Sequence, residues 1–376
     1  MRTIPKIIAM YLPQFHQIPE NDEFWGEGFT DWVTVKNAKP LFKRHKQPRI
    51  PLNNKYYDLS KEENVVWQAK MAKKYGIYGF GVYHYWFNND TNLLTKPAEI
   101  IRDNDDVNIN YFLAWDNANW KRSWSNVEGN DWTPTQDKIV NDNLCKQDNT
   151  NILVPYILGG KQDWEIHYRY VLGHFKSSKY IKIGNKPLFI IYNYSDQIEE
   201  MCKFWDKLAR IDGFDGVYFI MKYKHGITNP NIIRTFKYEP INSGWYKRSI
   251  KQRIKSRLRI IFDIEPTVRR FSYDKIWERI LLNAQKDSNS NIFHGGFVCY
   301  DDTPRRGNRG TVVLGATPEK FGFYLKKLLE ISANQCKEYV FITAWNEWGE
   351  GAILEPDIEN KYAYLEAIPI SQFSER

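Results

Sequence analysis

Two glutamates, Glu347 and Glu350, lie three residues apart after the apolar run 340–342. Residues at this spacing point to opposite faces of a continuous strand, whereas a turn can bring them to one face, and Gly349 and Gly351 favour a turn. Two carboxyl groups among aromatic side chains can adopt different pKa values, so that one acts as an acid and the other as a base. Cleavage of a glycosidic bond uses such a pair. The competing interpretation is that one glutamate caps the following helix while the other is solvated.

Aromatic side chains next to polar ones recur where apolar runs end. The segments are YLPQFH (11–16), YHYWF (83–87), WDNANW (115–120), IYN (191–193) and WNEWGEG (345–351). Aromatic residues make up 16% of the chain, with 14 Trp and 24 Tyr. Tyr and Trp combine an apolar face with a polar tip, which suits the C–H faces and hydroxyl edges of sugar rings. The alternative is a core with a few extra aromatic residues.

The order of apolar runs predicts the elements that must position these residues. Eight short apolar, β-branched and aromatic runs cover residues 6–12, 79–85, 111–115, 152–158, 187–192, 217–223, 293–300 and 339–345. Several are apolar at consecutive positions, as in strands that are covered on both faces. Helix-like segments lie between them: residues 61–75 follow a capping pattern at Ser60 and stop before Gly76, and residues 320–331 follow Thr317 and Pro318.

This alternation around eight strands predicts an α/β protein of the (β/α)8 TIM-barrel class, with its active site at the carboxyl ends of the strands. We expect residues 1–376 to form a single catalytic domain with a long insert at about 224–290. A doubly wound open sheet is the alternative. It would need a glycine-rich phosphate loop after the first strand, where this chain has YLPQFH.

The net charge of +8 is concentrated in residues 247–270, which hold nine basic and two acidic residues. Ile250, Ile254, Leu258 and Ile261 recur there at helical spacing, so we predict a basic amphipathic helix within the insert. Such a helix is either a solvated face or a surface that contacts an anionic membrane or a phosphate-bearing substrate. No nucleic-acid motif accompanies the patch, so no nucleic-acid partner is expected.

Neither a metal site nor a disulfide framework is expected. The four cysteines, Cys145, Cys202, Cys299 and Cys336, form no C-x-x-C pair, and the histidines show no metal-ligand spacing. No stretch of about 18 apolar residues is present, and the apolar run that ends at Pro13 is too short for a signal peptide. We therefore expect a cytoplasmic protein without metal or cofactor, placed at the inner face of the membrane if the basic helix binds lipid.

Short segments along the whole chain carry a recognisable pattern. They read YLPQFH (11–16), FWGEGFTDW (24–32), PLF (40–42), GIYGF (76–80), YHYWF (83–87), KPLF (186–189), DTPRR (302–306), WNEWGEG (345–351) and LEP (354–356). Together they resemble the WbsX family, which is related to glycoside hydrolase family 99. The resemblance implies a metal-free (β/α)8 barrel that acts in the metabolism of a surface polysaccharide such as O-antigen or capsule. WbsX proteins are described as glycosyltransferases, whereas family 99 members are endo-acting α-mannosidases and mannanases.

By that resemblance, Glu350 is the general acid/base on the glycosidic oxygen, and Glu347 is the base that deprotonates the sugar's 2-hydroxyl. The 2-oxygen then attacks C1 to form a 1,2-anhydro sugar, and two inversions give net retention, unlike the usual scheme with a carboxylate nucleophile. The residues expected to contact substrate, taken from these segments and strand ends, are Tyr11, His16, Glu27, Tyr83, His84, Trp86, Trp115, Asn117, Tyr192, Trp345 and Asn346. The chain departs from the family pattern at Ala118, where the family has Glu, and at Pro155 and Tyr156, where it has Gln-Glu. These departures imply altered substrate recognition.

Three hypotheses follow. The first is a retaining, endo-α-mannosidase-like enzyme that cleaves or transfers glycosidic bonds of a surface polysaccharide, with both glutamates facing a deep aromatic cleft. The second is a glycosyltransferase of lipopolysaccharide or capsule biosynthesis that meets phosphate or membrane through the basic segment, although no D-x-D motif of the usual nucleotide-sugar type is evident. The third is a non-catalytic glycan-binding protein, against which the two glutamates argue. In each case the expected partner is an oligosaccharide or a lipid-linked glycan.

Overall fold

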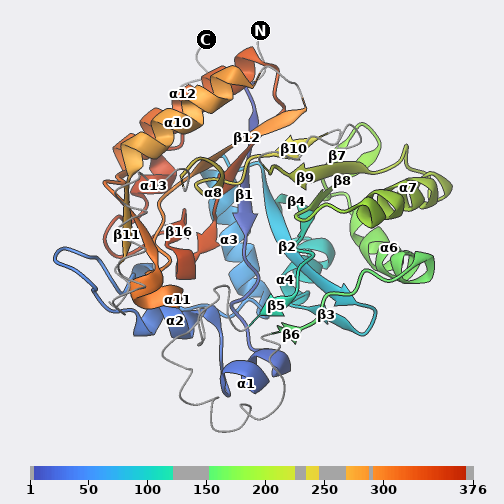
Figure 1. The fold of residues 1–376 in the computed structure, drawn as a ribbon, viewed down its shortest axis with the longest axis horizontal. Helices are drawn as coiled ribbons and strands as arrows, with labels where there is room; N and C mark the ends of the chain where they lie inside the picture. The colour runs from blue at the N-terminus through green and yellow to red at the C-terminus, as the bar shows by residue number, and fades with distance from the viewer. Residues whose placement is uncertain (1–3, 122–151, 225–233, 245–267, 288–290, 370–376) are drawn as a thin grey trace, which may run out of the picture.

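The computed structural model describes residues 4–121, 152–224, 234–244, 268–287 and 291–369, which form a closed parallel β-barrel with helices between its strands (Figure 1). The eight barrel strands within these ranges are β1 (Lys6–Tyr11), β2 (Gly79–Asn88), β4 (Asn110–Trp115), β8 (Lys186–Ile191), β9 (Tyr218–Lys222), β10 (Thr235–Phe236), β12 (Ile292–Phe297) and β14 (Tyr339–Thr343). Each pairs in parallel with the next barrel strand, and β1 pairs with both β2 and β14, which closes the ring. The predicted (β/α)8 class is confirmed.

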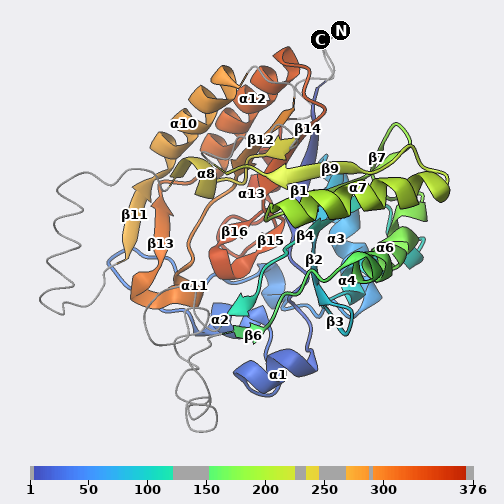
Figure 2. The ribbon, with the colours of Figure 1, turned by 45° about the vertical axis from the view of Figure 1, so that its right-hand side comes forward.

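Helices that connect the strands form the outer layer of the barrel. They are α3 (Glu62–Lys74), α4 (Lys96–Asp103), α6 (Lys161–Lys176), α7 (Asp196–Ile211), α8 (Ile241–Gly244), α10 (Tyr273–Lys286) and α12 (Pro318–Asn334). Helix α13 (Ala363–Glu366) follows the last strand and packs against α12. Near the carboxyl ends of the strands, away from both termini, lie α1 (Pro19–Trp25), α2 (Asp31–Asn37), α11 (Thr303–Arg306), β5 (Trp120–Lys121) and β6 (Ile152–Val154) (Figures 1 and 2). The smaller pieces are β3 (Thr91–Leu93), β7 (Lys182–Ile183), β11 (Arg269–Ser272), β13 (Thr311–Leu314), η1 (Leu52–Asn54) and η2 (Gly307–Arg309).

The predicted helix boundaries are close to the observed ones. Helix α12 begins where the Thr317 hydroxyl accepts a hydrogen bond from the Lys320 backbone N–H, with Pro318 as its first residue. Helix α3 stops just before Gly76, which has a positive φ of 82°. The predicted cap at Ser60 is wrong, because the residue before α3 is Lys61 and its side chain makes no capping bond.

Alternation along β2 decides which of its side chains face the barrel axis. Gly81 faces inward, because a Cβ atom there would lie 2.7 Å from the Phe112 ring, and Phe112 in turn lies 6.1 Å from Phe341 of β14, which does not neighbour β4 in the sheet. Side chains of a strand point alternately to its two faces. The odd-numbered positions Tyr83 and Tyr85 therefore face the barrel interior, and the even-numbered positions between and beyond them face the helices.

The predicted fourth strand, at 152–158, is wrong as a barrel strand. Only Ile152–Val154 is extended, as β6, and it pairs in antiparallel fashion with β5 outside the barrel. Barrel strands are covered on both faces, whereas Ile157 in this run is 58% exposed. The missing barrel strand is β10, which is only two residues long.

The expected insert at about 224–290 contains, in its described parts, barrel strand β10 and helix α10. The predicted basic helix at 247–270 lies outside the described residues except for 268–270. The prediction is wrong for Arg269 and Arg270, which begin strand β11, and Arg270 places its guanidinium 3.9 Å from the centre of the Phe42 ring. Within the described ranges, no helix is both long and apolar enough to cross a lipid bilayer.

Candidate active site

The two glutamates lie on a tight hairpin that follows β14. Strand β15 (Asn346–Glu347) pairs with β16 (Ala352–Ile353), and the 3-10 turn η3 (Trp348–Glu350) connects them. Gly351 ends the turn with a left-handed φ of 57°. Gly349 is needed for a different reason: a Cβ atom there would lie 2.7 Å from Oδ2 of Asp31. The turn that the two glycines predicted is therefore present, and it places both glutamates at the carboxyl end of the barrel.

A single arginine joins the two carboxyl groups. Arg305 Nη1 donates to Glu350 Oε1 at 3.1 Å, and its Nη2 lies 3.4 Å from Glu347 Oε2. The same guanidinium forms a bidentate pair with Asp31, at 3.2 Å from each oxygen. Asp31 also accepts the Gly349 backbone N–H at 3.1 Å. Helices α11 and α2 thus hold the glutamate hairpin through a fork of charge-assisted bonds.

Burial and charge separate the two carboxyl groups. Burial, and secondly the charge of Glu350, raise the pKa of Glu347 to about 8 against the lowering effect of the Arg305 guanidinium. Glu347 therefore keeps its proton at neutral pH. Only 5% of the Glu347 side chain is exposed, against 20% for Glu350. Among the described residues, Oε2 of Glu350 has no hydrogen-bond partner although it is buried.

Four tyrosines form a wall beside Glu347. Tyr83 and Tyr85 come from β2, Tyr192 follows β8, and Tyr238 follows β10. The Tyr83 and Tyr238 hydroxyls are hydrogen-bonded at 2.7 Å, and the Tyr192 ring lies about 6 Å from the rings of both. Burial raises the pKa of all four hydroxyls well above its ordinary value, and the Glu347 charge adds to the effect in each. The site is thus a carboxyl pair beside amphipathic rings.

Three of the predicted substrate contacts point away from this wall. His84, Trp86 and Trp115 lie between the barrel and helix α6, gathered around His167. His84 Nε2 lies 2.9 Å from His167 Nε2, the Trp86 ring stacks on His167 at 4.4 Å, and Trp115 Nε1 donates to the Trp86 carbonyl at 2.9 Å. Burial lowers the pKa of His84 to about 3, so its ring is uncharged at neutral pH. The structure brings these three residues together but not to the glutamates.

Other predicted contacts anchor the backbone around the site. Asn346 clamps Leu12, accepting its N–H at 2.7 Å and donating to its carbonyl at 2.9 Å. Asn117 exchanges hydrogen bonds with the Asn193 backbone at 2.7 and 2.8 Å. Trp345 is fully buried, 5.4 Å from the Phe80 ring. These side chains fix the strand ends from which the inward-facing residues project.

Among the described residues, no hydrogen bond or ion pair joins the last three predicted contacts to the carboxyl pair. The Tyr11 hydroxyl donates to Gln68 of α3 at 2.6 Å, on the helical side of β1. His16 is buried with Nδ1 3.0 Å from the Pro13 carbonyl, and burial lowers its pKa. Glu27 is exposed on the connection between α1 and α2.

The buried carboxyl group of Glu355 holds the glutamate hairpin by hydrogen bonds. Glu355 accepts hydrogen bonds at 2.7 Å from the Tyr57 hydroxyl, from Gln68 Nε2 and from Trp348 Nε1. Burial raises the pKa of Glu355 to about 7, against the lowering effect of these donors. Because Trp348 follows Glu347 directly, this network fixes the backbone between the two glutamates.

Sequence reasoning did not single out Asp31, Arg305 or Glu355, although each lies in a segment that carries the family resemblance: FWGEGFTDW, DTPRR or LEP. Tyr85 was likewise inside YHYWF. Tyr238 had no such signal, because the strand before it was not recognised. Membership in a matching segment is the signal that could have identified the first four.

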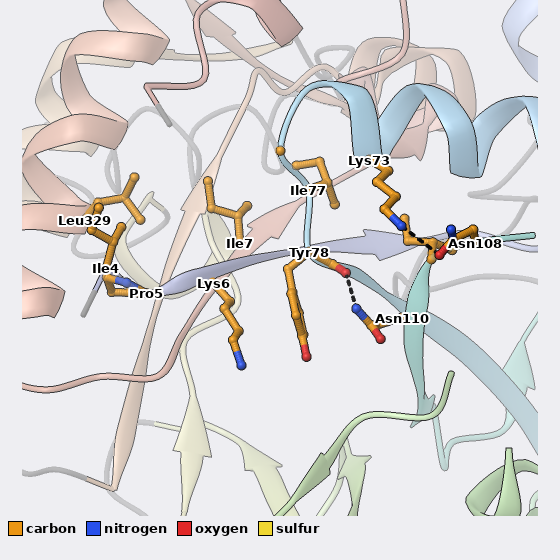
Figure 3. A pocket seen from close by; sticks show the side chains of 12 residues that line it. Ile4, Pro5, Lys6, Ile7, Lys73, Ile77, Tyr78, Asn108, Asn110 and Leu329 are labelled. Carbon is orange, nitrogen blue, oxygen red and sulfur yellow. Dashed lines mark hydrogen bonds between the residues drawn. The ribbon is translucent and has the colours of Figure 1, made fainter. Parts of the chain in front are cut away.

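A separate hollow of about 460 Å³ lies at the amino end of the barrel, around the start of β1 (Figure 3). Its described lining consists of Ile4, Pro5, Lys6, Ile7, Lys73, Gly76, Ile77, Tyr78, Asn108, Ile109, Asn110 and Leu329. No carboxylate is among these described residues, so the hollow offers no acid–base pair.

Comparisons with known proteins identify the family of the chain. A family profile described as "Glycosyltransferase WbsX" matches residues 7–368. Proteins named "Uncharacterized protein WxcX" from two strains of Xanthomonas campestris pv. campestris are 29% and 28% identical over 97% of this chain. The match covers 49% of each of them, so the chain spans about half the length of these relatives.

Two solved structures are similar over nearly the whole chain. The GH99 endo-α-mannosidase from Bacteroides thetaiotaomicron gives a TM-score of 0.56 at 14% identity, covering 99% of both chains. A protein described as "Glycoside hydrolase-like protein" gives a TM-score of 0.58 at 12% identity, covering 98% of this chain and 93% of its own. At such identities the likeness shows a shared fold.

Proposed function

This chain belongs to the WbsX glycosyltransferase family, and we propose that it is a carbohydrate-active enzyme that cleaves or transfers a glycosidic bond of a surface polysaccharide. We assign the chemistry to Glu347 and Glu350. The observation that carries the proposal is the pair of carboxyl groups bridged by Arg305, of which Glu347 is the more buried and keeps its proton to about pH 8. Such a pair can supply an acid and a base at the same pH.

The substrate that we favour is an α-mannoside, cleaved with retention. Its support is the fold shared with a GH99 endo-α-mannosidase. The axial 2-hydroxyl of an α-mannoside lies trans to the leaving group, so the 2-oxygen can displace it in line. The four tyrosines offer faces for the sugar ring.

The proposed reaction conserves one proton on the pair. In the first step the 2-oxygen attacks C1 and loses its proton to Glu347, while Glu350 gives its proton to the departing glycosidic oxygen. In the second step Glu350 takes a proton from water or from an acceptor hydroxyl as that oxygen opens the 1,2-anhydro ring, and Glu347 returns its proton to the 2-oxygen. The unliganded pair, with the proton on Glu347, has the protonation of the intermediate. One proton must therefore move to Glu350 before the first step.

The second candidate is a glycosyltransferase of polysaccharide biosynthesis, which the description of the matching family favours. In that case a sugar hydroxyl, and not water, opens the intermediate. The same two glutamates would act, so the acceptor distinguishes the candidates.

Product analysis with α-mannosyl oligosaccharides tests the proposal. Wild type should release a reducing sugar whose α anomer appears first by NMR, and Glu350→Gln should lower the rate by about 100-fold or more. Glu338→Gln is the matched control, because Glu338 pairs with Lys6 at the surface, where 44% of its side chain is exposed. Extension of an acceptor without release would support the transferase. Full activity in Glu350→Gln would overturn the site assignment.

A further inference from the structure

Lys222 places a positive charge inside the candidate site. It ends β9, and register with β8 and β10 turns its side chain inward with Tyr192. Its Nζ lies 4.8 Å from the centre of the Tyr192 ring and 4.6 Å from that of Tyr238. Among the described residues, the ammonium group makes these ring contacts but no hydrogen bond or ion pair.

The neighbouring charges leave Lys222 without a direct partner. Asp116 and Glu350 both favour its charged form, while burial has the larger effect and lowers its pKa. Neither carboxylate forms an ion pair with Lys222 in the described part of the chain. Arg305 is already committed to Asp31, Glu347 and Glu350. Within the described part of the chain, Lys222 is thus a cation of this site whose N–H donors have no acceptor.

Two further polar atoms at the site are unsatisfied. The Tyr192 hydroxyl belongs to a side chain that is 6% exposed, and it is buried with no hydrogen-bond partner in the described ranges. Oε2 of Glu350 is in the same condition. Buried polar groups are normally hydrogen-bonded, so atoms left open at one site indicate where a ligand supplies the missing partners.

We propose that Lys222 and the Tyr192 hydroxyl bind an anionic group of the substrate, either a carboxylate on an acidic sugar or a phosphate. An ammonium group carries three donors and is most stable, when withdrawn from water, against a negative charge. The Tyr192 hydroxyl is a neutral donor on a ring that the ammonium contacts, and the Tyr192 and Tyr238 rings stabilise the ammonium through cation–π contacts. This inference rests on the proposed function, since it describes the substrate of the same site.

Binding of simple ligands to the full chain tests the proposal without turnover. Glucuronate and inorganic phosphate are compared with glucose, which lacks the charge, by ligand-observed NMR at neutral pH. We expect wild type to bind at least one of the two anions about tenfold more tightly than glucose, because charge-assisted hydrogen bonds are the strong ones. Lys222→Met should remove this preference. Lys222→Arg keeps the charge and should retain most of it.

Lys224→Met is the matched control. Lys224 lies two residues further along the chain, is exposed and bonds to Asn193 Oδ1 at 2.8 Å, so its loss should leave the preference unchanged. A preference for glucuronate would identify an acidic sugar, and a preference for phosphate would identify a phosphorylated donor; either supports the proposal. Equal binding of all three ligands by wild type, or a preference that survives in folded Lys222→Met, would overturn it. Cleavage of neutral mannosides without anion preference would support the proposed function and overturn the anion site. Anion preference without cleavage would support the anion site and contradict the proposed function.

Discussion

The guanidinium of Arg305 lies 3.1 Å from Oε1 of Glu350, and its remaining nitrogens reach Glu347 and Asp31. One cation therefore serves three carboxyl groups. At neutral pH the proton on Glu347 removes one of their negative charges, because the Glu347 pKa is raised to about 8, mainly by burial.

The pH dependence of activity should report this proton. The carboxyl pair needs one proton to protonate the leaving group, so kcat/KM should fall as the pH rises through about 8. In Asp31→Asn this fall in kcat/KM should occur at lower pH. The substitution removes a negative charge that raises the Glu347 pKa, and it frees Arg305 to lower that pKa. The measurement is kcat/KM across the neutral and alkaline range. A fall in kcat/KM at the same pH in both proteins would contradict the assignment of this proton to Glu347.

Removing the bridge should destabilise the fold. Arg305→Met leaves three carboxyl groups, those of Asp31 and Glu347 buried, without their cation and should lower the free energy of unfolding by about 3–5 kcal/mol. Arg305→Lys keeps the charge but loses the fork, so its loss should be smaller. Arg210→Met is the control, since Arg210 pairs with Asp206 within one helix at 56% exposure and such pairs contribute about 0.3–0.5 kcal/mol. Urea unfolding measures all three, and equal losses for Arg305→Met and Arg210→Met would refute the bridge.

Glu355→Gln should weaken the support under the hairpin. Glutamine has one acceptor oxygen where three donors converge, so at least one donor is left unpaired, at a cost of about 1–3 kcal/mol at low pH. The effect also depends on pH. The folded-state pKa of about 7 lies above the ordinary value of 4.5, so the stability that neutral Glu355 contributes is complete below 4.5 and is lost as the pH rises through 7. Unfolding curves at several pH values should show a shallower decline in the variant than in wild type.

Trp115→Phe should change the stability of the fold, whereas Tyr192→Phe should change KM. Trp115 is enclosed by protein and donates to the Trp86 carbonyl, so its replacement should lower stability by about 1–3 kcal/mol and leave KM unchanged. The Tyr192 hydroxyl has no partner among the described residues, so Tyr192→Phe should keep the stability and raise KM. Thermal unfolding and KM, measured on the same preparations, show whether each side chain acts in the fold or in substrate binding. A raised KM in Trp115→Phe would restore Trp115 as a substrate contact.

The fold could be predicted wherever a strand is long enough to show its own pattern. Seven apolar runs correspond to barrel strands, but β10 covers only Thr235–Phe236 and is extended because β9 and β12 hold it on both sides. That support comes from tertiary pairing, which no local pattern reveals. The run at 152–158 was misleading for the converse reason, since apolar residues such as Ile157 remain exposed there.

The site was predictable only in its local part. The spacing of Glu347 and Glu350 with two glycines indicated the turn, because turn chemistry is a property of neighbouring residues. Asp31 and Arg305 meet across 274 positions, a contact that spacing cannot give. The direction of Tyr83 and His84 depends on which face of β2 is the inner one, and a shift of one residue would exchange them.

The pairing of β1 with β14 also sets the timing of assembly during synthesis. Lys6 pairs with Tyr339, so the first barrel strand to be synthesised waits for the last barrel strand before both of its edges are covered. The glutamate hairpin follows β14 directly, and Asn346 in it clamps Leu12 at the end of β1. Closure of the ring and completion of the carboxyl pair are thus one late event. A nascent chain that stops before β14 has neither a closed barrel nor the means to act on a sugar.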